Sequence, residues 1–351
     1  MFEIDFLPVG TSNGDAICIR YGQPNAFYVH VIDGGYADTA QTIVDHIRTH
    51  YGPGCFVNHL VLSHADNDHA TGLIGAMERV RVINLWMNRP WLYAAQVLPH
   101  FHGNYTLSGL VQKMCDMHPY LVRLEELALA QGTIIHEAFQ GDMIGQFVVL
   151  APSRARYIHL IPDLNKTPTS YREATAATGL MRASLEAAKK WVDEHWHLET
   201  LSNDPEPTSA SNETSLVQHA IIDGRSILLT ADVGPEGLNE AADYASRIGG
   251  LVPPNFVQVP HHGSRRNVTP HVLDRWLGAR TTEGQVYGTA YCSVGNEKPD
   301  YPRGQVKNAF LRRGYPVHVT RGITKTHSYG IGMRAGSSPS IPEPFANRVD
   351  T

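Results

Sequence analysis

The chain has 351 residues, of which 42% are hydrophobic, and a formal net charge of −5. This length can hold one large α/β domain or two smaller ones around a sizeable core. No apolar run approaches the ~20 residues of a membrane helix, and the acidic start Met1–Asp5 looks like a strand rather than a signal peptide. The four cysteines, Cys18, Cys55, Cys115 and Cys292, are scattered without a Cys-x-x-Cys pair. We therefore expect reduced cysteines and a cytoplasmic protein without a membrane partner.

The first strand signal with a polar ending lies at residues 27–32, an apolar run that stops at Asp33 and two glycines. Short runs of β-branched and aromatic residues stopped by glycine are typical of strands. Residues 39–51 follow with apolar residues at helical spacing and predict a helix. A lone aspartate after a strand is usually a turn residue, so Asp33 indicates little by itself.

The next strand signal, residues 60–63, runs directly into the segment His-Ala-Asp-Asn-Asp-His, which extends from His64 to His69. Imidazole and carboxylate groups are ligands of Zn²⁺, Mn²⁺ and iron. A strand end is a rigid mount for such ligands. The alternative is a helix cap at Asp66 or Asn67, but a cap needs one polar group and not two histidines with two aspartates.

The middle of the chain is richer in helix signals. Residues 90–135 and 171–201 have apolar residues at helical spacing and predict helices. Residues 203–212 are polar and proline-rich and predict a loop.

Two further strand signals end in possible metal ligands. Residues 227–231 precede Asp232, and residues 256–260 precede His261 and His262. Because four strand signals end in aspartate or histidine, one shared metal centre explains them more economically than four unrelated turns.

The order of these residues resembles the metallo-β-lactamase-fold hydrolases, and more closely the hydrolase domain of ComEC-type competence proteins. The phrases that carry the resemblance are Leu7-Pro8-Val9-Gly10 with Asn13-Gly14-Asp15-Ala16, Asp33-Gly34-Gly35, His64-x-Asp66-x-Asp68-His69, Asn212-x-x-Ser215, Asp232, His261-His262-Gly263-Ser264 and Cys292-Ser293-Val294-Gly295-Asn296. The resemblance implies an α/β fold, an αββα sandwich formed by residues 1–351 as a single domain. Residues of about 85–135 and 153–208 would be helical insertions that cover the site, or else thicken the core or form a dimer contact.

The resemblance also implies a site with two divalent metal ions, Zn²⁺ or Mn²⁺. The implied ligands are His64 and Asp66 for the first ion and Asp68, His69 and His261 for the second, with Asp232 between the two. Asp33 would orient a ligand histidine, and His262 would act on the substrate oxyanion or the leaving group, so Asp68, His262 and Asp33 are the predicted catalytic residues. Which of His261 and His262 is the ligand stays open, although analogy with His-x-Gly-Thr phrases favours His261.

In most of the superfamily a third histidine binds the first metal, where this chain has Asn212 and Ser215. The first site should therefore be weaker and richer in oxygen ligands. We expect Asn212, Ser215, Ser264, Arg265 and Arg266 to contact the substrate.

The implied activity is hydrolysis by a dinuclear metal-bound hydroxide, with a phosphodiester substrate and nucleic acid as the first candidate partner. The alternatives are a small-molecule ester, phosphoester or lactone hydrolase, and an inactive metal-binding module of a larger assembly. The acidic balance of the chain does not favour a nuclease, which usually has a basic surface. The basic residues that could contact phosphate are Arg265, Arg266, Arg303, Lys307, Arg312, Arg313, Arg321 and Lys325.

Overall fold

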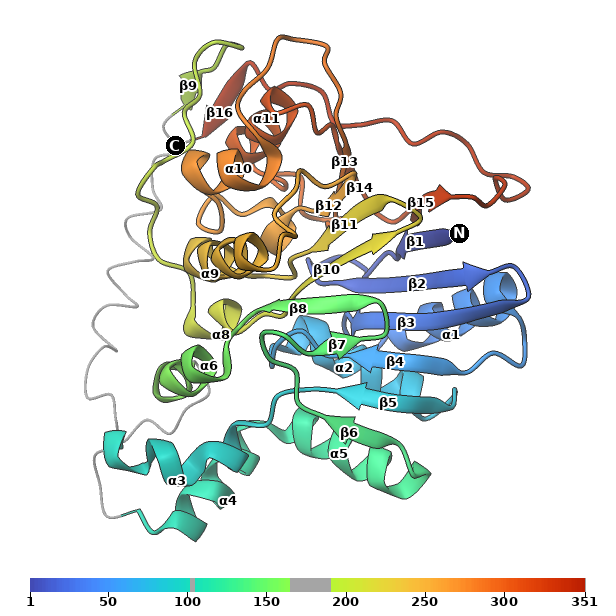
Figure 1. The fold of residues 1–351 in the computed structure, drawn as a ribbon, viewed down its shortest axis with the longest axis vertical. Coiled ribbons are helices and arrows are strands. Elements are labelled where there is room, and N and C mark those ends of the chain that lie inside the picture. The colour runs from blue at the N-terminus through green and yellow to red at the C-terminus, as the bar shows by residue number, and fades with distance from the viewer. Residues whose placement is uncertain (102–104, 165–190, 351) are drawn as a thin grey trace.

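The computed structural model describes residues 1–101, 105–164 and 191–350, and within them the strands form two seven-stranded sheets (Figure 1). The first sheet has the order β15 (Lys325–Tyr329), β1 (Phe2–Phe6), β2 (Ala16–Gln23), β3 (Ala26–Gly34), β4 (Val57–Val61), β5 (Val82–Trp86) and β6 (Ile134–His136). The second has the order β14 (Val317–Val319), β13 (Thr289–Cys292), β12 (Phe256–Gln258), β11 (Arg225–Leu229), β10 (Val217–Ile222), β8 (Phe147–Ala151) and β7 (Met143–Ile144). A separate pair joins β9 (Trp191–Asp193) to β16 (Arg348–Asp350).

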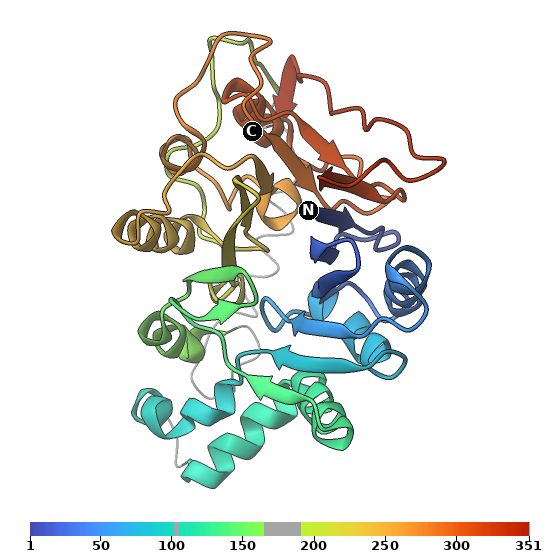
Figure 2. The same ribbon diagram turned by 45° about the vertical axis from the view of Figure 1, so that its right-hand side comes forward.

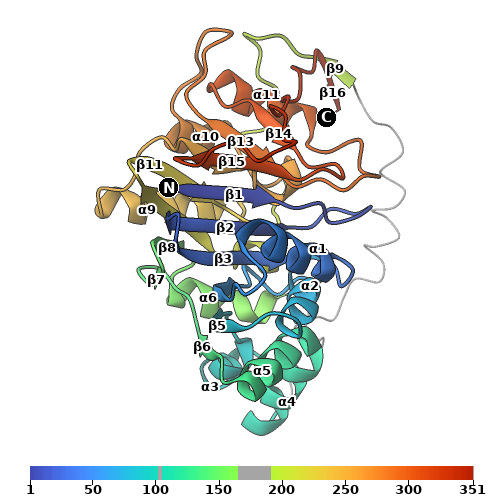
Figure 3. The same ribbon diagram turned by 90° about the vertical axis from the view of Figure 1, so that its right-hand side faces the viewer.

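The helices cover the outer faces of the two sheets. The first group comprises α1 (Thr39–His46), which continues as a π-helix over Ile47–Tyr51, α2 (Asn67–Met77), α3 (Ala94–Val97), α4 (Leu107–Met117) and α5 (Pro119–Gln131). The second comprises α6 (Arg154–Leu160), α8 (Ala210–Glu213), α9 (Pro235–Arg247), α10 (Pro270–Leu277) and α11 (Gly304–Arg312), and short 3-10 turns lie at 90–93, 98–100, 161–163 and 260–263. Figure 2 shows α1 in blue and α9 in gold on opposite outer sides of the sheets. Figure 3 shows α1, α2 and α5 in front of the first sheet.

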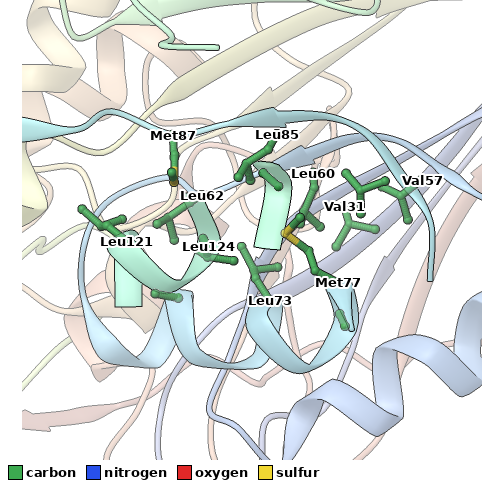
Figure 4. Close-up of a cluster of buried hydrophobic side chains, with 14 of the residues drawn as sticks. Val31, Val57, Leu60, Leu62, Leu73, Met77, Leu85, Met87, Leu121 and Leu124 are labelled. Carbon is green, nitrogen blue, oxygen red and sulfur yellow. The ribbon is translucent and has the colours of Figure 1, made fainter. Parts of the chain in front are cut away.

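Three apolar clusters join these layers. Between the sheets, Phe6 packs edge-on against Phe256 and Tyr291. Figure 4 shows Leu60 and Leu85 of the first sheet beside Leu73 of α2 and Leu124 of α5. On the other outer face the second sheet packs on α9, α10 and α11, through side chains that include Val257, Leu238, Trp276 and Phe310. The layers therefore follow the order αββα, and the predicted α/β sandwich is confirmed.

Parallel strands bring the polar loops to one edge of this sandwich. Strands β3 to β6 run parallel to one another, as do β11 to β14. The carboxyl ends of parallel strands meet at the same edge of a sheet, which is where open α/β sheets bind ligands. Asp33 lies at the end of β3, and the segments after β4, β11 and β12 carry the predicted ligands to this edge.

Helix α2 packs directly on the end of β3 because both contain glycine at the contact. A Cβ atom on Gly72 would lie 1.8 Å from the carbonyl oxygen of Gly34, a distance that no side chain can occupy. This close approach places the first turn of α2, with Asp68 and His69, beside Asp33.

The helix predictions are confirmed over 39–51 and over much of 90–135, but the predicted helix at 171–201 is wrong where the structure describes it. Trp191–Asp193 is the strand β9, and the chain from there to 209 has no helix. The remaining part of that prediction, residues 171–190, lies outside the described residues. The predicted loop at 203–212 is confirmed up to Ser209, after which α8 begins.

All four cysteines are free, as expected, and Cys18 and Cys292 are buried. Among the helices of the described residues we find none with the length and apolar character needed to span a bilayer.

Candidate metal centre

Histidine and aspartate side chains from four loops converge at the carboxyl edge of the sheets. The His69 Nε2 atom lies 3.4 Å from Asp232 Oδ2 and 4.0 Å from Asp68 Oδ2. The imidazole rings of His64 and His69 are 4.3 Å apart between centroids, and His64 Nε2 lies 3.5 Å from Asp66 Oδ2. The His64-to-His69 segment and Asp232 therefore lie close together in space, although strands of both sheets lie between them in the sequence.

Asp33 fixes two of the histidines at once. Its Oδ2 atom accepts a hydrogen bond from His69 Nδ1 at 2.7 Å and another from Ser63 Oγ at 2.6 Å. The Ser63 hydroxyl has a single proton, which it gives to Asp33, so the 3.0 Å contact with His64 Nδ1 assigns the proton of that contact to the imidazole. Both rings consequently direct Nε2 toward the centre. Asp33 thus lies behind the ligand atoms, where it can orient both rings.

His262, and not His261, lies among the clustered ligand atoms. The His262 Nε2 atom is 3.7 Å from Asp232 Oδ2 and 3.9 Å from Asp68 Oδ2, while its Nδ1 donates to the Ser293 carbonyl oxygen at 3.0 Å. The His261 side chain is 31% exposed. Its Nδ1 accepts a hydrogen bond from the Asn212 amide at 2.6 Å and lies 3.7 Å from Asp232 Oδ2. The sequence left the choice between His261 and His262 open and favoured His261; the unpartnered Nε2 atom beside Asp232 favours His262.

The backbone is strained at this site. Among the described residues, six non-glycine residues have positive φ, and four of them are Asp33, Ala231, His261 and His262. Such conformations cost about 1–3 kcal/mol each and persist only where the surroundings impose them. Gln258 supplies part of this constraint, because its Oε1 accepts hydrogen bonds from the backbone N–H groups of Thr230 at 3.0 Å and Ala231 at 2.9 Å. These turns aim Asp232 and His262 at the same point.

Several buried atoms of the cluster have no hydrogen-bond partner among the described residues. They are Nε2 of His64, His69 and His262 and Oδ1 of Asp232. Unsatisfied buried polar atoms are rare and call for an explanation such as a bound ion. Imidazole nitrogens and carboxylate oxygens are also the donors that divalent transition metals bind, so the residues present fit a metal centre.

The pKa shifts of Asp232 and His69 are consistent with a site that binds a cation. Burial raises the pKa of Asp232, but the imidazoles of His261 and His262 outweigh it and hold the pKa of this carboxyl well below its usual range. Burial lowers the pKa of His69, but the carboxylates of Asp232 and Asp33 raise it well above its usual range. A metal ion binds the neutral imidazole, so a cation bound here would take the place of a proton on His69.

The sequence analysis missed Asp15. A ligand atom of this buried carboxylate lies within 4.8 Å of ligand atoms of His69, Asp232 and His262. The signal was present in the sequence, because an aspartate follows Gly14 directly before an apolar strand, but it lies far in sequence from every other ligand.

The other predicted site residues differ in their exposure and in their distance from the cluster. Asp66 and Asp68 are partly exposed at 28% and 27%, so both reach the open side of the cluster. Asn212 holds His261, and Ser215 is fully buried. Ser264 and the partly exposed Arg265 follow His262, and Arg265 donates to the backbone oxygen of Asp350 at 3.1 Å. Arg266 is exposed.

We expect Asp33→Asn to weaken metal binding at both halves of the cluster by about 10–100-fold, the usual cost of losing a group behind a metal ligand. The carboxylate accepts three hydrogen bonds, one at Oδ1 and two at Oδ2, whereas an amide offers an acceptor oxygen at only one of these positions. Competition with a chelator, followed by metal analysis, measures the effect. Asp142→Asn, at an exposed turn where Asp142 accepts from the Phe139 N–H, is the control and should retain metal like the wild type. Retention of both ions by a folded Asp33→Asn protein would contradict this role.

No protein-family model matches this sequence, and no curated protein matches it. Solved structures with a similar backbone include the metallo-β-lactamase fold protein YhfI from Bacillus subtilis, at 10% identity and a TM-score of 0.41, over 93% of this chain and 100% of that chain. The CmlA β-hydroxylase is similar at 12% identity and a TM-score of 0.41, over 93% of this chain and 54% of that chain. A metallo-β-lactamase from Cronobacter sakazakii with a HARLDQ motif is similar at 13% identity and a TM-score of 0.32, over 71% of this chain and 75% of that chain. These similarities concern the backbone, so the chemistry of the site rests on this chain's own residues.

Proposed function

We propose that this protein is a metal-dependent hydrolase of the metallo-β-lactamase superfamily. The observation that carries the proposal is the set of buried, unpartnered Nε2 atoms of His64, His69 and His262 around Asp232. We assign His64 and Asp66 to a first divalent ion and Asp68, His69 and His262 to a second, with Asp232 between them. The ions are Zn²⁺ or Mn²⁺, and the first site is the weaker because it offers fewer ligands.

Divalent ions held here would lower the pKa of water toward neutrality and compensate negative charge on a substrate oxygen. The chain's own residues prepare the site for that chemistry. Asp33, Ser63 and the Ser293 carbonyl oxygen keep the Nδ1 protons of the histidines in place, so the rings cannot turn. His261 is the imidazole that remains accessible to a substrate, and it takes the role of contacting the leaving group that the sequence analysis gave to His262.

For the substrate we propose a phosphodiester, with nucleic acid as the first class to test. The ComEC-type phrases of the sequence support this choice. So does Arg266, which is exposed two residues beyond Ser264 and could hold a neighbouring phosphate. Arg265 and Arg266 also line a cavity of about 260 Å³ together with Asp204, Glu206 and Gln305.

The other basic residues do not support a long nucleic-acid surface. Arg312 and Arg313 are fully buried, so the expectation that they contact phosphate is wrong. Arg303, Lys307 and Arg321 are already paired with carboxylates. This pairing favours a second candidate, a small-molecule ester, phosphoester or lactone hydrolase. An inactive metal-binding module is the remaining alternative.

Turnover of five substrates with added Mn²⁺ or Zn²⁺ tests the proposal: single-stranded DNA, double-stranded DNA, RNA, bis(p-nitrophenyl) phosphate, and a carboxylic ester or lactone. We expect phosphodiester cleavage, and we expect Arg266→Ala to reduce kcat/KM for it by about 10-fold, the value of one charged hydrogen bond. Arg247→Ala, an exposed arginine on α9, is the matched control and should leave turnover unchanged.

Each outcome decides between the candidates. Turnover of the ester or lactone without cleavage of any phosphodiester would replace the substrate proposal and keep the hydrolase. Metal binding without turnover of any of these substrates would favour the inactive module.

A further inference from the structure

Asp15 carries a buried carboxylate directly before β2, and the proposed function gives this residue no role. Its residue is 1% exposed. One oxygen, Oδ2, accepts a hydrogen bond from Gln258 Nε2 at 3.0 Å. The other, Oδ1, has no hydrogen-bond partner among the described residues. One of the two oxygens belongs to the group whose ligand atoms lie within 4.8 Å of one another.

The chain holds Asp15 firmly in this place. A Cβ atom on Gly14 would lie 2.7 Å from the Asp68 carbonyl oxygen, so the turn before Asp15 fits against Asp68 only with glycine. The Asp15 N–H donates to that same Asp68 oxygen at 3.3 Å, and the Asp15 carbonyl oxygen accepts from the Gly35 N–H at 2.6 Å. Through Gln258 the carboxylate is also tied to the strained turn before Asp232. Asp15 is therefore positioned by both sheets.

This position is electrostatically unfavourable without a cation. The Asp15 carboxylate shares this buried group with the Asp232 carboxylate, and the ligand atoms of the group lie within 4.8 Å of one another. A buried charge is normally paired or coordinates a metal. The Gln258 amide and the Ser293 hydroxyl beside Asp15 are both neutral, so neither supplies the positive charge that two neighbouring buried carboxylates need.

We propose that Asp15 is a ligand of the cation that His69, Asp232 and His262 hold. This inference rests on the proposed function and adds a residue to its second metal site. With Asp15 that site presents two imidazoles and up to three carboxylates. Such an oxygen-rich set favours harder divalent ions such as Mn²⁺ or Fe²⁺ over Zn²⁺.

Asp15→Asn tests the proposal through Mn²⁺ binding and thermal stability, without any activity assay. We expect Mn²⁺ affinity, measured by electron paramagnetic resonance of the free ion, to fall by at least about 10-fold. Removing a residue that only orients a metal ligand already costs about 10-fold or more, and removing a ligand should cost no less. We expect the metal-free variant to melt at the same temperature as the wild type or higher, because the substitution removes a like charge beside Asp232. A merely structural Asp15 would lower the metal-free melting temperature and leave Mn²⁺ affinity intact. Asp142→Asn is again the control.

Asp15→Cys gives a second readout if the amide variant does not fold. A thiolate bound to Cd²⁺ produces an ultraviolet charge-transfer absorption, and soft metals select thiolate ligands. We expect Cd²⁺ to induce this absorption in Asp15→Cys beyond any signal from the four native cysteines in the wild type. Its absence from folded, Cd²⁺-loaded Asp15→Cys would overturn the proposal, as would unchanged Mn²⁺ affinity in Asp15→Asn. Failure of the wild type itself to bind Mn²⁺ or Cd²⁺ would instead refute the proposed function.

Discussion

His262→Ala is expected to remove the second metal ion and to lower hydrolysis by more than about 10²-fold, whereas His261→Ala is expected to keep the metal. Losing a group behind a ligand already costs about 10–100-fold, and losing the ligand itself should cost more. The two residues are adjacent in sequence, but only His262 directs an unpartnered Nε2 at Asp232. In His261 the Nδ1 atom accepts a hydrogen bond from the Asn212 amide.

Metal content after gel filtration, together with kcat/KM, measures the difference between the two variants. His261→Ala should reduce turnover only, by about 10²–10⁴-fold if its imidazole protonates the leaving group. His50→Ala, an exposed histidine on the π-helical end of α1, controls for the loss of an imidazole as such. Loss of metal in His261→Ala with full retention in His262→Ala would reverse the assignment and restore the one that the sequence favoured.

The sequence could not decide which of His261 and His262 faces the cluster. The strand ending at Gln258 was predictable from its apolar run, and so was the presence of a ligand directly after it. Which of two adjacent side chains faces the cluster depends on backbone angles, and both residues adopt a left-handed conformation that no local propensity favours. The outcome is set by the Ser293 carbonyl oxygen and by Asn212, which come from other parts of the chain.

Neither the role of Asp15 nor the strand β9 could be predicted from the sequence, because contacts between distant parts of the chain determine both. The motif from His64 to His69 could be predicted as a metal site because its ligands lie within one short segment. Asp15 joins them only when β2 and β12, from different sheets, place Asp15 and Gln258 in contact. Trp191–Asp193 has apolar residues that suit a helix, but it pairs as a strand with Arg348–Asp350 in the last residues of the sequence. Tertiary pairing overrides local preference in such short segments.

Buried arginines hold the segment after β9, and we expect Arg312→Met to cost about 3–5 kcal/mol of unfolding free energy, the usual cost of breaking a buried ion pair. The Arg312 side chain is completely buried, as is its partner Glu194. Its guanidinium also donates to the backbone oxygens of Trp196 at 2.8 Å, His195 at 2.6 Å and Leu198 at 2.7 Å. The substitution leaves the buried Glu194 carboxylate without its cationic partner and removes the guanidinium donor from these carbonyl groups.

Urea denaturation of wild type and variant measures this free energy. Arg275→Met is the matched control, because Arg275 pairs with Asp243, whose side chain is 60% exposed, and exposed ion pairs contribute about 0–1 kcal/mol. The double variant Arg312→Met, Glu194→Leu should recover part of the loss, since it removes the uncompensated charge. It should not recover all of it, because the carbonyl oxygens of Trp196 and Leu198 remain without this donor and each can cost about 1–3 kcal/mol. Equal, small losses in Arg312→Met and Arg275→Met would mean that the residues after β9 contribute little to the stability of the fold, and that Glu194 finds water when its partner is removed.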